Sequence, residues 1–190
     1  MSDVAPLRNL AFVGHPSAGK TTLVDALAYV LGATDRKGSV ADKTSICDTE
    51  PEEHERQHTL SIAVVHAKKD GVEWNLVDTP GYPEFMGDTL AALLATDLAV
   101  GVVSCTSGVS FNLLQKMAAA SEMGRGRAII VTHVDGENSN FDTTLQHLIE
   151  RVGKVCIPIL VPDQSGHGFS AVKTPGGDWR KHFSDRVMDA

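Results

Sequence analysis

Cysteines are scarce in this sequence, and long apolar runs and an excess of basic residues are absent. The three cysteines, Cys47, Cys105 and Cys156, are odd in number and lack C-x-x-C or zinc-finger spacing, so we expect reduced thiols in a cytoplasmic protein. No apolar run approaches the roughly 18 residues of a membrane-spanning helix, and residues 1–8 do not resemble a signal peptide. Lysine and arginine number 17 against 24 aspartates and glutamates, so the net charge of −7 predicts no broad basic surface. We therefore expect a soluble protein without DNA or membrane partners, with at most a local basic patch.

The 190 residues are enough for one globular domain, because such a chain can bury about 70% of its extended surface without disulfides or metals. Short apolar runs predict strands at residues 10–13, 60–65, 74–77, 98–103, 128–131 and 155–161. Apolar residues at helical spacing predict a helix that begins at Lys20 and others over residues 85–94, 113–117 and 145–152. Asp70 and Gly71 predict a tight turn that makes the second and third strands antiparallel. The alternation predicts an α/β fold, with a mostly parallel sheet, one antiparallel hairpin and helices on both faces.

Two segments lack a periodic pattern. Residues 33–58 read as a long surface loop, and residues 50–55 within it read mainly as a solvated acidic loop. Order also weakens after Pro162, in a glycine-rich stretch. Pro158 predicts that the strand at residues 155–161 is irregular or lies at a sheet edge.

Residues 14–21 fit the pattern G-x-x-x-x-G-K-[ST], and they stand between a predicted strand and a predicted helix, as this phosphate-binding motif requires. In that setting, backbone N–H groups and the helix N-terminus surround a polyphosphate, while Lys20 approaches its β- and γ-oxygens and Thr21 offers a hydroxyl to Mg²⁺. Nucleotide contacts are expected from Gly14, His15, Pro16, Ser17, Ala18, Gly19, Lys20, Thr21 and Thr22.

A second set of candidate residues follows the strand at residues 74–77: Asp78, Thr79, Pro80 and Gly81. The Asp78 carboxylate is placed to hold a water on Mg²⁺, and the Gly81 N–H to meet a γ-phosphate. An ordinary strand-to-helix turn is the alternative, since all these residue types favour turns.

From about Leu10 onward, the sequence resembles the translational GTPases, and within them elongation factor G and the elongation-factor-G-like proteins. The markers lie at residues 14–21, 55–59, 78–82 and 131–135. The resemblance implies a P-loop NTPase fold that binds GTP or GDP with Mg²⁺, hydrolyses GTP, and meets the ribosome through a longer protein. It implies that residues 1–162 form the GTP-binding domain and that residues 163–190 begin a truncated insertion, with a possible helix at 179–187. We expect this piece to be monomeric.

The resemblance also implies roles for individual residues. Residues 33–58 correspond to switch I, and Thr59 to the threonine that binds Mg²⁺ and senses the γ-phosphate. Asp135 corresponds to the aspartate that accepts hydrogen bonds from guanine, while Thr132 and His133 stand where the family has Asn and Lys. The implied catalytic set is Lys20, Thr59, Gly81 and Tyr82, and the implied metal set is Thr21, Thr59 and Asp78.

Two departures from the family bear on hydrolysis. Tyr82 replaces a histidine that positions the attacking water, and a phenol donates a hydrogen bond but is a poor proton acceptor. Ser17 replaces a common aspartate. These changes predict slow hydrolysis and leave open a nucleotide-gated binding switch with little or no catalysis. An ATP-using enzyme is a third reading if Thr132 and His133 have lost guanine selectivity. A zinc site at Cys47, His54 and His58 would lack a fourth ligand.

Overall fold

The structure, a computed structural model, describes residues 6–153 and 155–174, and the chain divides into two compact units. The first unit is Met1–Val103 with Ser110–Ile130, and the second is Ser104–Val109 with Val131–Ala190. The helix expected at residues 179–187 lies outside the described residues. No helix within the described residues is long and apolar enough to cross a membrane.

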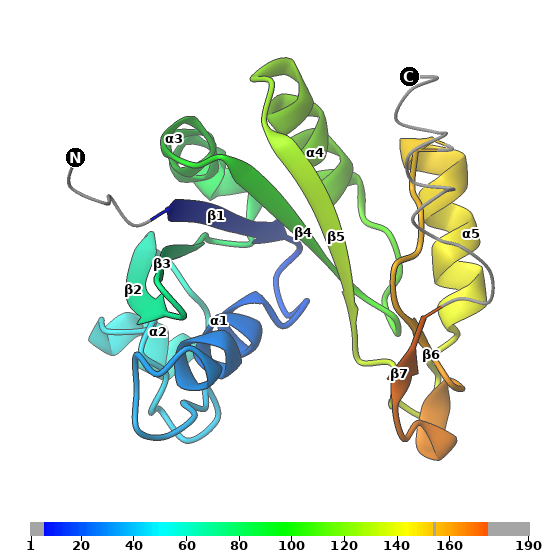
Figure 1. Ribbon diagram of the computed structural model, residues 1–190, viewed down its shortest axis with the longest axis horizontal. Helices are drawn as coiled ribbons and strands as arrows, with labels where there is room; N and C mark the ends of the chain where they lie inside the picture. The colour runs from blue at the N-terminus through cyan, green and yellow to red at the C-terminus, as the bar shows by residue number, and fades with distance from the viewer. Residues whose placement is uncertain (1–5, 154, 175–190) are drawn as a thin grey trace. The chain divides into compact units, whose positions relative to one another are not determined.

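The first unit is built on a five-stranded sheet in the order β2-β3-β1-β4-β5 (Figure 1). The strands are β1 (Leu7–Gly14), β2 (Ala63–Lys69), β3 (Val72–Asp78), β4 (Leu98–Ser104) and β5 (Gly126–Thr132). β1 pairs in parallel with both β3 and β4, and β2 pairs antiparallel with β3. The predicted α/β fold with one antiparallel hairpin is therefore confirmed. The apolar run of β5 predicts a buried strand, but most of its residues are exposed, and β5 is an edge strand with one neighbour.

Helices cover both faces of the sheet in the first unit (Figure 1). α1 (Lys20–Val30) packs on one face, where Val24 and Ala28 join Phe12 of β1 in a fully buried cluster. α3 (Met86–Ala95), which follows the short helix η1 (Pro83–Phe85), and α4 (Phe111–Glu122) pack against β1 from the other face. A Cβ built on Gly101 of β4 would lie 2.9 Å from the Met117 sulfur, so a larger residue there would require this side chain of α4 to shift.

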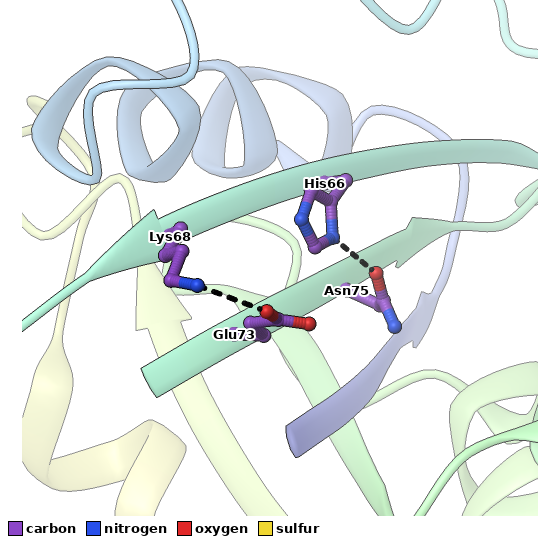
Figure 2. A network of polar contacts seen from close by, with 4 residues as sticks. All are labelled: His66, Lys68, Glu73 and Asn75. Carbon is purple, nitrogen blue, oxygen red and sulfur yellow. Dashed lines mark hydrogen bonds and ion pairs between the residues drawn. The ribbon is translucent and has the colours of Figure 1, made fainter. Parts of the chain in front are cut away.

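The β2–β3 hairpin has the predicted tight turn. Asp70 and Gly71 both have positive φ, 52° and 76°, as a two-residue type I′ turn requires. This turn sets the register in which His66 faces Asn75 and Lys68 faces Glu73, at 2.9 Å and 3.2 Å between their side chains (Figure 2). The Lys68–Glu73 ion pair is exposed, so it adds little stability.

Strand β2 begins at Ala63 and not at residue 60, as the apolar pattern predicts. The physical reason lies outside the strand, because the N–H groups of Leu60 and Ser61 donate to the side chain of Glu53 at 2.8 Å and 3.1 Å. Backbone groups bound in this way are not available to a sheet ladder.

The second unit contains α5 (Phe141–Val152), which confirms the predicted helix and starts at an Asn140 side chain that accepts from the Thr143 N–H at 2.9 Å. The prediction of a strand over residues 155–161 is wrong. Only β6 (Val161–Pro162) forms, and it pairs with β7 (Val172–Lys173) in a separate two-stranded sheet around the short helix η2 (Gly166–Gly168). Pro158 and Pro162 lack the N–H groups that a longer ladder needs.

Candidate nucleotide site

The phosphate-binding loop runs from the end of β1 at Gly14 to the start of α1 at Lys20. A Cβ at Gly14 would lie 2.5 Å from the Val102 carbonyl oxygen, so only glycine fits there. Ser17 and Gly19 have φ of 59° and 86°, the left-handed conformation that turns successive backbone N–H groups into one concavity. The Lys20 side chain is 5% exposed, and its ammonium donates to the His15 carbonyl oxygen at 3.1 Å. His15, Ser17 and Thr22 are exposed.

Four oxygen-bearing side chains converge beside this loop. Thr21 of α1 donates to Oδ2 of Asp78, at the end of β3, at 2.6 Å, and Thr59 donates to Oδ1 of Asp48 at 2.9 Å. The two threonine hydroxyl oxygens are themselves 2.8 Å apart. The structure thus brings together all three predicted metal residues, and it adds Asp48, which is 3% exposed and which sequence reasoning did not select.

The cluster has more short oxygen contacts than hydroxyl protons. Three contacts below 3 Å link the carboxyls and hydroxyls, but two hydroxyls carry only two protons. Either a carboxyl keeps the third proton or a cation holds the oxygens together. Oδ1 of Asp78 is also buried with no hydrogen-bond partner among residues 6–153 and 155–174. Hydroxyl and carboxylate oxygens are ligands that Mg²⁺ accepts, so these residues fit the ion.

Burial moves the ionisable groups of the cluster toward their neutral forms. It raises the pKa of Asp78 to about 6, against the opposing effect of the Lys20 charge and the Thr21 hydrogen bond. It lowers the pKa of Lys20, against the opposing effect of Asp78, and raises the pKa of Asp48, against the Thr59 hydrogen bond. A protonated carboxyl is therefore accessible near neutral pH, as the third contact requires without a metal.

We expect Asp78→Asn to stabilise the nucleotide-free protein while weakening Mg²⁺-dependent nucleotide binding. Between pH 3.8 and about 6 the folded state binds the Asp78 proton more tightly than the unfolded state, so wild-type stability falls as pH rises through this window. Asparagine removes that fall, so above pH 6 the variant gains up to about 3 kcal/mol in the free energy of unfolding. Urea unfolding at pH 4 and pH 7 measures the difference. Equal effects at the two pH values would contradict the assignment.

The sequence predicts a solvated acidic loop at residues 50–55, and this prediction is wrong. The segment contains the helix α2 (Pro51–Arg56). Glu53 of this helix is fully buried, and its carboxylate accepts from the backbone N–H groups of Thr49, Glu50, Leu60 and Ser61 at 2.8–3.1 Å. Burial favours the neutral carboxyl, but these donors outweigh it and hold the pKa of Glu53 below its usual value. Glu53 thus closes residues 49–61 around itself and places Thr59 at the cluster.

The turn after Asp78 lies directly on the phosphate loop. The Thr79 hydroxyl donates to the Phe12 carbonyl oxygen at 2.7 Å, and a Cβ on Gly81 would lie 2.6 Å from the Pro16 nitrogen. Only glycine therefore permits this approach. The Tyr82 ring meets the His58 ring edge to face, with centroids 5.2 Å apart, so the segments before Thr59 and after Gly81 touch.

The residues predicted to contact guanine share one turn of the second unit. The Thr132 hydroxyl and Nδ1 of His133 are 3.2 Å apart, His133 has a φ of 53°, and the Asp135 side chain is exposed. Ser139 supports this turn by donating to the Val134 carbonyl oxygen at 2.7 Å. The phosphate-side residues belong to the first unit.

The zinc alternative is not assembled, because no three His, Cys, Asp or Glu side chains gather as a metal site within the part of the chain that the structure describes. Cys47 is buried, and burial followed by the surrounding carboxylates, Asp78 first, raises the pKa of its thiol. A protonated thiol is a poor zinc ligand.

The sheet order and the glycine-rich loop between β1 and α1 define a P-loop nucleotide-binding fold. Residues 5–178 match the model of the elongation factor Tu GTP binding domain. The chain belongs to this family, the translational GTPases, so the resemblance found in the sequence is confirmed.

Within this family, the chain is similar to elongation factor G and elongation factor G-like proteins. The chain is 34% identical over 160 residues to an elongation factor G-like protein of Mycobacterium tuberculosis, covering 84% of this chain and 22% of the relative. It is 31% identical over 166 residues to elongation factor G 2 of Streptomyces coelicolor, covering 87% and 24%. A crystal structure of a Thermus thermophilus protein superposes with a TM-score of 0.84 at 32% identity, covering 90% and 26%. The chain thus spans about a quarter of the length of these proteins.

Proposed function

We propose that the chain is the GTP-binding domain of a translation factor, which binds GTP or GDP with Mg²⁺ and hydrolyses GTP to GDP and phosphate. Hydrolysis is slow until the whole protein meets the ribosome in the cytoplasm. One observation carries the proposal: Lys20, Thr21, Thr59 and Asp78, from three separate segments, converge beside a glycine-rich loop. The buried Lys20 ammonium and the hydroxyl and carboxylate oxygens, which suit a metal ion, together fit a nucleoside triphosphate.

Each group of this chain has a distinct task in the proposed reaction. The N–H groups of residues 14–21 and the Lys20 ammonium bind the β- and γ-phosphates. Thr21 and Thr59 would bind Mg²⁺ and Asp78 would hold a water on it, and the ion would neutralise phosphate charge. The Gly81 N–H binds the γ-phosphate, and the Tyr82 hydroxyl orients a water. The water oxygen bonds to the γ-phosphorus while the bond to the β–γ bridging oxygen breaks, and the water proton passes to phosphate as GDP leaves.

Base selection falls to the second unit in this proposal. Asp135 accepts hydrogen bonds from the ring nitrogen and the exocyclic amine of guanine, donors that adenine does not present together. The His133 imidazole stacks on the base in place of a lysine stem, and Thr132 borders it. Competition of ATP against fluorescent GTP measures this selectivity, and equal affinities would favour the reading as an ATP-using enzyme.

The direct test is titration of the protein with fluorescent GTP and GDP, with and without Mg²⁺, followed by single-turnover hydrolysis with and without ribosomes. Binding of both nucleotides, tightened by Mg²⁺, is the expected result, together with hydrolysis that ribosomes accelerate. Absence of binding under all these conditions would refute the proposal.

A nucleotide-gated switch without useful hydrolysis is the second candidate, favoured by the phenol of Tyr82 and its contact with His58. We expect Tyr82→His to change the single-turnover rate by less than about threefold, because the tyrosine hydroxyl already orients the water, and Tyr82→Phe to lower it. A rise of about a hundredfold in Tyr82→His, the gain that a positioned base supplies, would instead favour the switch.

A further inference from the structure

A lysine from α4 lies fully buried behind the phosphate site. Lys116 is 0% exposed, and its ammonium donates to three backbone carbonyl oxygens: those of Gly14 at 3.1 Å, Pro80 at 3.0 Å and Gly81 at 3.3 Å. Asn112, one turn earlier on α4, donates to the same Gly81 oxygen at 2.6 Å. A buried ammonium is costly unless its protons are bound, so these contacts hold it in one place.

The three carbonyl groups that Lys116 binds belong to two different loops. Gly14 ends β1 and starts the phosphate loop, while Pro80 and Gly81 form the turn that follows β3. Gly81 also lies tight against Pro16, where a Cβ would come within 2.6 Å of the backbone nitrogen. Lys116 therefore fastens the turn to the phosphate loop from the α4 side of the sheet.

The hydrogen bond to Pro80 has a directional consequence. The Pro80 carbonyl and the Gly81 N–H belong to one peptide unit, and in a planar trans peptide these groups point in opposite directions. When Lys116 holds the Pro80 oxygen, the Gly81 N–H must point away from α4. The bonds to the Gly81 oxygen, from Lys116 and Asn112, fix the next peptide in the same manner.

The charge of Lys116 also reaches the phosphate site. Burial, and then the positive charge of Lys20, lower the pKa of Lys116 to about 8, so it is mostly protonated at neutral pH. The ammonium groups of Lys20 and Lys116 together raise the local positive potential, which favours the more highly charged nucleotide.

We propose that Lys116 is a positioning residue that orients the Gly81 N–H toward the γ-phosphate, with Asn112 assisting, and so favours GTP over GDP. The inference rests on the proposed function, because it names what sets the preference of that same site. Lys116 touches no phosphate itself and acts through the Pro80–Gly81 peptide.

Lys116→Met tests the proposal, since methionine keeps much of the buried stem and removes the donor. Affinities are measured with fluorescent GDP and with a fluorescent GTP analogue that carries a β,γ-imido bridge. We expect the affinity for the triphosphate to fall about tenfold, as loss of a charge-assisted hydrogen bond implies, and that for GDP to fall less than about threefold. Gln115→Met, an exposed neighbour on α4, is the matched control and should change neither affinity. Equal losses for both nucleotides, or no loss in the folded variant, would overturn the proposal.

Asn112→Ala keeps the test decisive if Lys116→Met does not fold, and it should shift the same ratio by a smaller factor. Amide hydrogen exchange without nucleotide gives a readout that does not depend on binding. Exchange at residues 81–82 should accelerate about tenfold in Lys116→Met and by a smaller factor in Asn112→Ala, while residues 98–103 stay unchanged. Unchanged exchange at residues 81–82 would overturn the role of Lys116. If the wild-type protein binds neither nucleotide, the proposed function fails by that result alone, and exchange still decides whether Lys116 holds the turn.

Discussion

Lys20→Ala is expected to lower the affinity for both GTP and GDP by at least about a hundredfold, with the fold retained. The Lys20 ammonium is buried and donates to the His15 carbonyl oxygen of its own loop, so it lies within the phosphate-binding loop. Charge-assisted hydrogen bonds contribute about 1.5–3 kcal/mol each, and loss of two such bonds to phosphate oxygens corresponds to about two to four orders of magnitude in the dissociation constant. Titration with fluorescent nucleotides measures the change.

Lys68→Ala is the matched control for this experiment. Lys68 lies on β2, its side chain is 63% exposed, and it pairs with Glu73 of the neighbouring strand (Figure 2). It should bind nucleotide as the wild type does and should unfold within about 0.5 kcal/mol of it. Unchanged nucleotide binding in Lys20→Ala would remove Lys20 from the site and, with it, the main support for the proposed function.

The parts of the site that sequence could predict are contiguous in the chain. Residues 14–21 carry their own glycine, lysine and threonine pattern, and the strand and helix around them follow from apolar periodicity alone. Asp78 was predictable because it ends a strand beside that loop. The geometry now shows Thr21 and Asp78 in contact, although 57 residues separate them.

The parts that sequence could not predict depend on long-range contacts of single side chains. Glu53 reads as one more acidic residue in a charged stretch, and only the folded chain shows four backbone N–H groups around it. Lys116 could have been noticed in the sequence, because it lies at i+3 from Leu113 and beside Met117, on the apolar face of α4. A charged residue in that position predicts a buried partner, but its acceptors lie 35, 36 and 102 residues away.

Glu53→Ala is expected to open the segment at residues 49–61 without unfolding the sheet. The substitution leaves four backbone N–H groups without their acceptor, at about 1–3 kcal/mol for each one that stays buried. Because the segment can detach and rehydrate these groups, we expect the loss to appear as local opening, limited to about 3–5 kcal/mol. Amide exchange in residues 49–61 should rise at least about a hundredfold, while exchange in β4 stays unchanged.

Opening this segment also separates Thr59 from Thr21 and Asp48, so Glu53→Ala should lose the part of nucleotide affinity that depends on Mg²⁺ and keep the part that Lys20 provides. Since the folded pKa of Glu53 lies below its ordinary value of 4.5, its contribution is present above pH 4.5 and disappears as pH falls through the folded pKa. Wild type and Glu53→Ala should therefore differ in exchange at pH 7 and converge in strong acid. Glu52→Ala, an exposed neighbour in α2, is the control and should match the wild type. A uniform loss of stability over the whole domain would instead show that Glu53 supports the core and does not specifically hold residues 49–61 closed.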